Sequence, residues 1–154
     1  MYDITIGTGE AGKAENPQII SSGGMGPCIS IGIYDPITKR GYMRHQNSPD
    51  NDSEMEDFII KTLTECFNAN ILDVYVAGGA EGKFAEGVLD SRIYVEELLL
   101  KYFDKDQIKT KWSKYDTTTE LILNCKTGKF KVVDCDKAAK KEEEESDEEK
   151  IWNS

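Results

Sequence analysis

A strand, a turn and a returning strand between Cys28 and His45 constrain the fold of this chain more than any other segment. Residues 28–34 (CISIGIY) alternate with the period of a half-buried strand, and residues 35–40 (DPITKR) have the composition of a turn. Residues 41–45 (GYMRH) can then return antiparallel to the first strand. The segment therefore predicts a β-hairpin.

The register of this hairpin decides which side chains share a face. If Tyr34 pairs with Gly41, one face carries the side chains of Cys28, Ser30, His45 and Asn47. Cys28 and His45 are then diagonal neighbours, with backbones roughly 7–8 Å apart and side chains within reach of each other. A slip of one residue would put them on opposite faces.

A cysteine within reach of a histidine is typical of nucleophilic catalysis. A thiol attacks as the thiolate, and an adjacent imidazole is the usual base that produces it near neutral pH. His45 is the only histidine in the sequence, so it is the single candidate base for Cys28. The alternative interpretation is a buried cysteine that acts as a small hydrophobic residue, beside an ordinary surface histidine.

Several further motifs follow one another along the chain. They are GTGE at 7–10, NP at 16–17, SGGMGPC at 22–28, YDP at 34–36, GYMRH at 41–45, Pro49 and AGGA at 77–80. In order and spacing they resemble the CheD family of chemoreceptor glutamine deamidases. The resemblance runs from about Tyr2 to Asp134, and its most specific part is the series of Gly-rich loop with Cys, Tyr-Asp-Pro and Met-x-His.

The resemblance implies a set of site residues. Cys28 is the implied nucleophile, His45 its base and Ser22 the third group, whose hydroxyl would hold the imidazole in its productive tautomer. Backbone N–H groups around Gly26 and Cys28 are candidate oxyanion donors. Close approach of the substrate backbone is attributed to the glycines of the loop, Gly23, Gly24 and Gly26.

Two positions depart from the family pattern. Ser22 stands where the family usually has Thr, and a serine without the β-branch is less restricted about χ1. Pro27 stands where the family more often has Ser, which removes a backbone N–H beside Cys28. These departures affect the orientation of His45 and the oxyanion site.

On this resemblance we expect a hydrolase that deamidates glutamine side chains of chemoreceptors or other signalling proteins through a thioester on Cys28. One alternative is a catalytically weak or inactive module of the same fold that docks receptors or signalling partners. Another is a different Cys-His acyl transfer, such as ester or amide hydrolysis or transglutamination. No cofactor is expected, and contact with a membrane is expected only through a receptor.

Charge and cysteine spacing argue against other classes of protein. The formal net charge is −10, and no Lys/Arg cluster precedes the C-terminal segment, so a nucleic-acid partner is not expected. The four cysteines show no CxxC spacing and have a single histidine as possible co-ligand, so no metal site is expected. Cys66, Cys125 and Cys135 are interpreted as structural thiols.

Length and charge distribution predict one domain with a tail. Residues 1–135 are predicted to form the CheD-like deamidase domain, and residues 136–154 an acidic, flexible C-terminal tail with eight acidic and four basic residues. No stretch is long and apolar enough to span a membrane, and the N-terminus lacks a basic region and an apolar h-region. The expected location is therefore the cytoplasm.

Apolar spacing predicts helices between strands. A helix is expected from Ser53 on, with an apolar face of Met55, Phe58, Ile59, Leu63 and Phe67. A buried strand is expected at 71–77, and a second helix capped by Asp90, with a face of Ile93, Leu98, Leu99 and Tyr102. Three more strands are expected at 108–115, 120–125 and 130–133, the last two as a hairpin. This α+β pattern, with mixed or antiparallel sheets and two main helices, is by resemblance a layered α-β-β sandwich.

The segment 7–13 (GTGEAGK) also matches part of a phosphate-binding loop. Residue 14 is Ala where such a loop needs Ser or Thr for magnesium, and Pro17 interrupts any helix that would hold the phosphates. A turn leading into a strand is the favoured interpretation.

Overall fold

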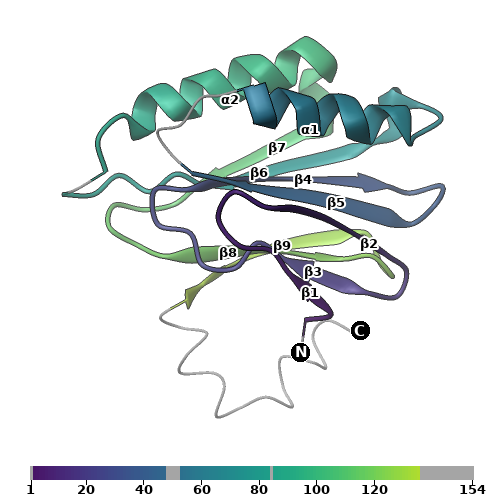
Figure 1. The fold of residues 1–154 in the computed structure, drawn as a ribbon, viewed down its shortest axis with the longest axis horizontal. Coiled ribbons are helices and arrows are strands. Elements are labelled where there is room, and N and C mark those ends of the chain that lie inside the picture. The colour runs from purple at the N-terminus through teal and green to yellow at the C-terminus, as the bar shows by residue number, and fades with distance from the viewer. Residues whose placement is uncertain (1, 48–52, 84, 136–154) are drawn as a thin grey trace.

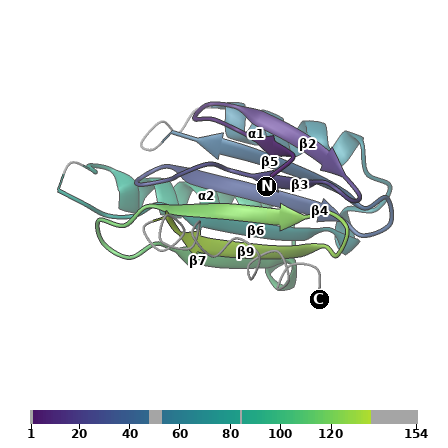
Figure 2. The same cartoon turned by 90° about the horizontal axis from the view of Figure 1, so that it is seen from below.

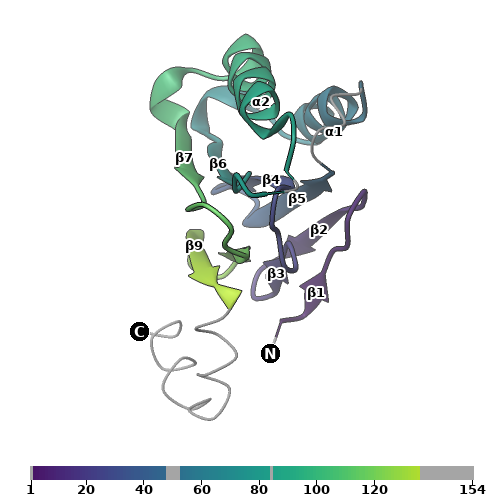
Figure 3. The same ribbon diagram turned by 90° about the vertical axis from the view of Figure 1, so that its left-hand side faces the viewer.

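The computed structural model describes residues 2–47, 53–83 and 85–135, which fold into three layers. Two helices cover one face of a five-stranded sheet, and a four-stranded sheet covers the other face (Figures 1 and 3). The predicted α+β architecture of two helices and two mixed sheets is confirmed. The predicted tail at 136–154 lies outside the described residues, so the domain boundary stays a prediction.

The elements follow one another in this order: β1 Ile4–Thr5, β2 Ala11–Glu15, β3 Ile19–Ser21, β4 Ile29–Asp35, β5 Arg40–Gln46, α1 Ser53–Thr64, η1 Ala69–Ile71, β6 Asp73–Gly78, α2 Val88–Tyr102, η2 Lys105–Gln107, β7 Ile108–Trp112, β8 Thr119–Asn124 and β9 Lys129–Asp134.

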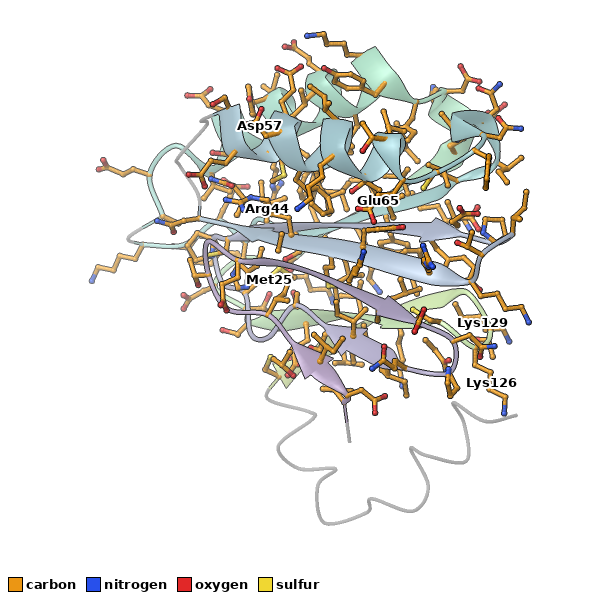
Figure 4. The ribbon with its side chains drawn as sticks, turned by 45° about the vertical axis from the view of Figure 1, so that its right-hand side comes forward. Met25, Arg44, Asp57, Glu65, Lys126 and Lys129 are labelled. Carbon is orange, nitrogen blue, oxygen red and sulfur yellow. The ribbon has the colours of Figure 1, made fainter. Side chains whose placement is uncertain are left out.

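The five-stranded sheet has the order β2-β5-β4-β6-β7, with a parallel pair between β6 and β7 and antiparallel pairs elsewhere. β4 lies in its centre, and all seven of its residues are buried because both faces of the sheet are covered. Apolar side chains of α1 and α2 pack on one face of β4 and β6. On this helix side, Arg44 lies between the sheet and α1 and donates to Glu54 at 2.6 Å (Figure 4).

The four-stranded sheet has the order β1-β3-β8-β9 and faces away from the helices (Figure 2). A second apolar cluster fills the space between the two sheets, with the fully buried Met25 among its members (Figure 4). Met25 also forms an isolated antiparallel bridge with Thr119, the first residue of β8. The loop that precedes Cys28 is thereby fixed to the four-stranded sheet.

Three details of the predicted helices are wrong. α1 ends at Thr64, so Phe67 lies beyond it and is 93% exposed. The second helix begins at Val88 with Gly87 as its N-cap, which puts Asp90 inside the first turn. Ile93 is 53% exposed, because it lies on the solvent side of α2. For Phe67 and Ile93, apolar spacing extended the predicted buried face beyond what the sheet covers, and for Asp90 a residue type common at N-caps lies inside the helix.

The strand predictions hold in position, with ends that differ by at most three residues. β6 begins at Asp73, and β7 ends at Trp112, three residues before the predicted end. β8 and β9 form the predicted antiparallel hairpin, with Asn124 opposite Lys129. Within the described ranges, no helix is long and apolar enough to cross a membrane.

Candidate functional site

The β4–β5 hairpin brings Cys28 and His45 to one end of the central sheet. Tyr34 pairs with Gly41 and Ser30 with His45, which is the register predicted from the sequence. Cys28 directly precedes β4 and packs against the cluster between the two sheets. Because side chains alternate along a strand, Cys28 and His45 both point toward the four-stranded sheet.

The His45 ring is buried and anchored by one of its nitrogens. Nδ1 lies 2.7 Å from the main-chain carbonyl oxygen of Ser22, and the side chain is 2% exposed. A carbonyl oxygen accepts only, so Nδ1 carries the proton of the neutral ring. Nε2 is then the atom that can take a proton from a nucleophile, and the Thr8 hydroxyl approaches it at 3.5 Å.

Burial sets the protonation state of this ring. Desolvation lowers the pKa of His45 below its ordinary value of 6.5, and it outweighs the carbonyl groups of Ser22 and Ile6 and the charge of Glu10, which act in the opposite direction. The imidazole is therefore neutral at neutral pH. A neutral imidazole with a free Nε2 is competent as a general base.

The Ser22 hydroxyl has a different task from the one predicted. It accepts a hydrogen bond from the Leu121 amide at 2.9 Å and donates to the Gly23 carbonyl oxygen at 2.7 Å. Ser22 follows β3, and its own amide donates to the Leu121 carbonyl oxygen, so residue 22 continues the pairing with β8. The structure thus places Ser22 beside His45, but it is the main chain and not the hydroxyl that contacts the ring.

Residues 23–27 form a tight loop between β3 and Cys28. Gly23 has φ +71°, in the left-handed region, and its N–H donates to the Ser21 hydroxyl. The Gly26 carbonyl oxygen accepts a hydrogen bond from the Ala80 amide, and the Cys28 carbonyl oxygen accepts one from the Gly79 amide. The residues that directly follow β6 therefore support the loop. The contact is close, because a Cβ at Gly78 would collide with the Cys28 carbonyl oxygen.

The Cys28 thiol bonds to the side chain opposite it in the hairpin register. Its Sγ lies 3.7 Å from Oδ1 of Asn47. Within the described residues, no hydrogen bond joins Sγ to the His45 ring. Catalytic hydrogen bonds are often long or absent before substrate binds, so this spacing is compatible with a nucleophile and base that meet during the reaction.

A pocket of about 260 Å³ opens beside the nucleophile loop. It is lined by Gly26 and Pro27, by residues 80–83 and by residues 116–118. Gly26 leaves open space where a side chain would point. The pocket thus lies beside the two residues that directly precede Cys28.

Three further residues lie at this site, and Thr8 is the one that the sequence did not indicate. Thr8 belongs to the GTGE motif, which leads through a turn into β2, as expected. The Gly9 amide of the same motif donates a hydrogen bond to the His45 carbonyl oxygen, so the motif packs beside His45. Asn47 and Ser30 follow from the predicted register; Asn47 is exposed, whereas the burial of Ser30 depends on the second sheet. Across the described ranges, no cluster of three or more His, Cys, Asp or Glu side chains could hold a metal ion, and all four cysteines are free.

Comparisons with known proteins point to one relationship. No protein-family model matches the chain. The chain is 34% identical over 86 residues to the chemoreceptor glutamine deamidase CheD of Thermotoga maritima, a match that covers 49% of this chain and 55% of that protein. The chain is thus CheD-like over about half of its length, and it spans about half the length of this curated relative.

Among solved structures, the crystal structure of the hypothetical protein YfiH of Bacillus licheniformis aligns with a TM-score of 0.48 and 12% identity. The alignment covers 66% of this chain and 49% of that one. A likeness this low carries no argument about function.

Proposed function

We propose that this CheD-like chain is a protein-glutamine deamidase with Cys28 as nucleophile and His45 as base. The observation that carries the proposal is the anchored ring of His45, whose Nε2 carries no proton in this tautomer and lies on the sheet face that also carries Cys28. A ring held by Nδ1 keeps the tautomer that a general base requires. The relative with 34% identity bears the name of this activity.

In the first half of the proposed reaction, His45 takes the proton of the Cys28 thiol, and the thiolate attacks the carboxamide carbon of a substrate glutamine. The resulting imidazolium protonates the departing nitrogen. Ammonia leaves, and the glutamyl group stays on Sγ as a thioester.

In the second half, the same ring acts on water. Nε2 of His45 accepts a proton from a water molecule that attacks the thioester carbon. The thiolate leaves, takes back the proton and releases the substrate as glutamate. The carboxamide nitrogen has been exchanged for an oxygen from water, and the enzyme returns to its starting state.

The loop and its pocket are proposed to receive the substrate. Pro27 has no N–H, so the remaining candidate donors to the developing oxyanion are the N–H groups of Gly26 and Cys28. The pocket beside Gly26 would accommodate residues that flank the reactive glutamine. A Cβ built at Gly24 would lie in ordinary contact distance of Thr118 and Cys135, so the loop packs closely against these residues.

We further propose that the substrate is a chemoreceptor or a similar signalling protein, as in the name of the relative. A cytoplasmic location is part of this proposal, because a thiolate nucleophile and three further free cysteines require a reducing compartment. The membrane is then reached only through the receptor.

The test combines two readouts on one substrate. Purified protein is incubated with the cytoplasmic part of a chemoreceptor, ammonia is measured, and glutamine-to-glutamate changes are located by mass spectrometry. Cys28→Ala and His45→Ala should abolish both signals, and Cys66→Ser should not change them. Cys66 is a matched control because it is also a partly exposed thiol, far along the sequence from the site.

The outcomes separate the alternatives. Receptor binding without ammonia or mass change favours the inactive docking module, for which the missing bond between Cys28 and His45 is the supporting observation. Transfer of an added amine to glutamine, with ammonia released, favours transglutamination. A reaction that survives Cys28→Ala would contradict every version of the proposal.

A further inference from the structure

Ser30 carries a buried hydroxyl that has no hydrogen-bond partner. The residue is 0% exposed, and its Oγ is one of three buried side-chain polar atoms without a partner in the described part of the chain, the others belonging to Thr38 and Tyr42. A buried polar group without a partner costs free energy, and native proteins keep few of them. The position therefore calls for an explanation other than stability.

The sheet register places this hydroxyl between the nucleophile and the base. Ser30 lies directly opposite His45 on β5, and it follows Cys28 by two residues on the same face of β4. Cβ atoms of directly opposed residues are roughly 4.5–5.5 Å apart, and same-face neighbours along a strand are about two residue rises apart. Ser30 is thus nearer to each of the two than they are to each other across the diagonal.

The other neighbours of Ser30 offer nothing to bond. On its second side it lies opposite Ala77 of β6, which has no polar side-chain atom. On the side of the four-stranded sheet, Ser30 faces the apolar cluster between the two sheets, which includes Met25 and Leu121. Cys28 and His45 are the neighbours on this face of the hairpin that can exchange a proton with the hydroxyl, although neither is hydrogen-bonded to it in the resting structure.

We propose that the Ser30 hydroxyl bridges Cys28 and His45 and passes the proton between them. The thiol proton moves to Ser30 Oγ as the proton of the Ser30 hydroxyl moves to Nε2 of His45. The S–H and the original O–H bonds break, a new O–H and an N–H bond form, and the products are a thiolate, a neutral serine and an imidazolium. This inference rests on the proposed roles of Cys28 and His45.

Three observations support the bridge. The thiol and the ring make no direct hydrogen bond, so a relay is needed or the groups must move. A hydroxyl has one donor and two acceptor positions, which suits a bridge, and rotation about χ1 moves its oxygen between the staggered positions. A hydrogen bond that Ser30 gains only when the thiolate and imidazolium charges develop lowers the reaction barrier without stabilising the resting state.

The surrounding charges do not take over this role. Glu10, on the loop before β2, is the carboxylate whose field reaches His45. Glu120, on β8 of the four-stranded sheet, accepts hydrogen bonds from the Ser21 hydroxyl and from the Cys135 thiol. Glu10 favours the imidazolium through its charge, and neither carboxylate can donate a proton to replace the one that leaves the thiol.

The experiment measures alkylation of Cys28 by iodoacetamide at neutral pH, together with the free energy of unfolding. Ser30→Ala should slow alkylation about tenfold or more, because the thiolate–imidazolium pair loses the hydroxyl that would bond to both charges, and less thiolate is then present to react. The same change should leave the free energy of unfolding equal or higher, since it removes a buried hydroxyl without a partner. Ser30→Thr keeps the hydroxyl and should restore most of the rate.

Two further variants show whether the effect runs through His45. In a His45→Ala background, adding Ser30→Ala should cause no further loss, because groups that act as a unit are not additive. Thr38→Val, which removes a buried hydroxyl without a partner at the far turn of the hairpin, should leave alkylation unchanged.

Wild-type alkylation in Ser30→Ala would overturn the bridge and leave the deamidase proposal standing. Slowed alkylation in a protein that deamidates no glutamine would instead support the bridge and count against the proposed substrate.

Discussion

The main-chain carbonyl oxygen of Ser22 lies 2.7 Å from Nδ1 of His45, so the segment before Cys28 orients the ring through its backbone. Any amino acid at position 22 supplies this carbonyl. The serine side chain is used for another contact, the bond from the Leu121 amide. The main chain of Ser22 therefore orients His45, and its side chain stabilises the four-stranded sheet.

Ser22→Ala should mainly cost stability. The change leaves the Leu121 amide, in a fully buried residue, without its acceptor, which costs about 1–3 kcal/mol in the free energy of unfolding. Urea denaturation measures this loss, and Ser22→Thr should avoid it because the hydroxyl is kept. Unchanged stability in Ser22→Ala would show that the hydroxyl bond to Leu121 contributes nothing.

Iodoacetamide should label Cys28 before the other thiols. Burial raises the pKa of Cys66 to about 11 and that of Cys125 to about 11, so neither forms much thiolate at neutral pH. Cys28 is partly exposed and lies on the sheet face of His45. Mass spectrometry of peptides after short exposure gives the order of labelling.

The histidine variant serves as the control for that experiment. His45→Ala should slow labelling of Cys28 and leave Cys66, Cys125 and Cys135 unchanged. Labelling of all four thiols at one rate, or indifference of Cys28 to the loss of His45, would contradict activation by the imidazole.

Stability should depend on pH through His45. Because burial lowers the pKa of the folded ring below 6.5, the unfolded chain binds more protons once the pH falls below about 6.5. The free energy of unfolding is then fully retained above this value and decreases as the pH falls toward the pKa of the folded ring. His45→Gln should remove this part of the dependence in denaturation curves taken at several pH values. An equal slope in the variant would contradict the assignment.

Two glycines near the nucleophile should respond in opposite ways to alanine. Gly78 has φ +94°, and a Cβ there would collide with the Cys28 carbonyl oxygen, so Gly78→Ala should lower stability by more than 1 kcal/mol and displace Cys28. Gly26 has an ordinary φ and open space around its Cβ position, so Gly26→Ala should fold as the wild type does.

The Gly26 variant also tests the pocket. If the pocket beside Gly26 receives the substrate chain, Gly26→Ala should raise KM for glutamine turnover more than it lowers kcat. Normal kinetics in this variant would mean that the substrate approaches Cys28 from another side. A stable Gly78→Ala variant with normal alkylation would show that the support from β6 is not needed.

Local sequence was sufficient for the hairpin that carries the site. The six-residue turn and the alternation of 28–34 predict the pairing of Tyr34 with Gly41, and a period of two then puts Cys28, Ser30 and His45 on one face. These are relations between near neighbours along the chain. The β8–β9 hairpin could be predicted for the same reason.

The helix predictions were wrong where the buried face was inferred from apolar periodicity alone. Phe67 and Ile93 fit the apolar spacing of a helix, but both are exposed, because α1 ends before Phe67 and the covered face of α2 is narrower than its apolar face. A spacing pattern marks the side of a helix that can be buried. How much of that side is covered depends on the sheet beneath it.

By itself, the sequence indicated Cys28 and His45 as candidate nucleophile and base and predicted the face they share, because these follow from residue identity and strand period. Only the tertiary structure decided how the site is held. The contact of His45 with Ser22, the approach of Thr8 and the burial of Ser30 all depend on the four-stranded sheet and the N-terminal loop packing onto β4 and β5. Such contacts join residues far apart along the chain, and their distances depend on how two layers meet, which no local pattern records.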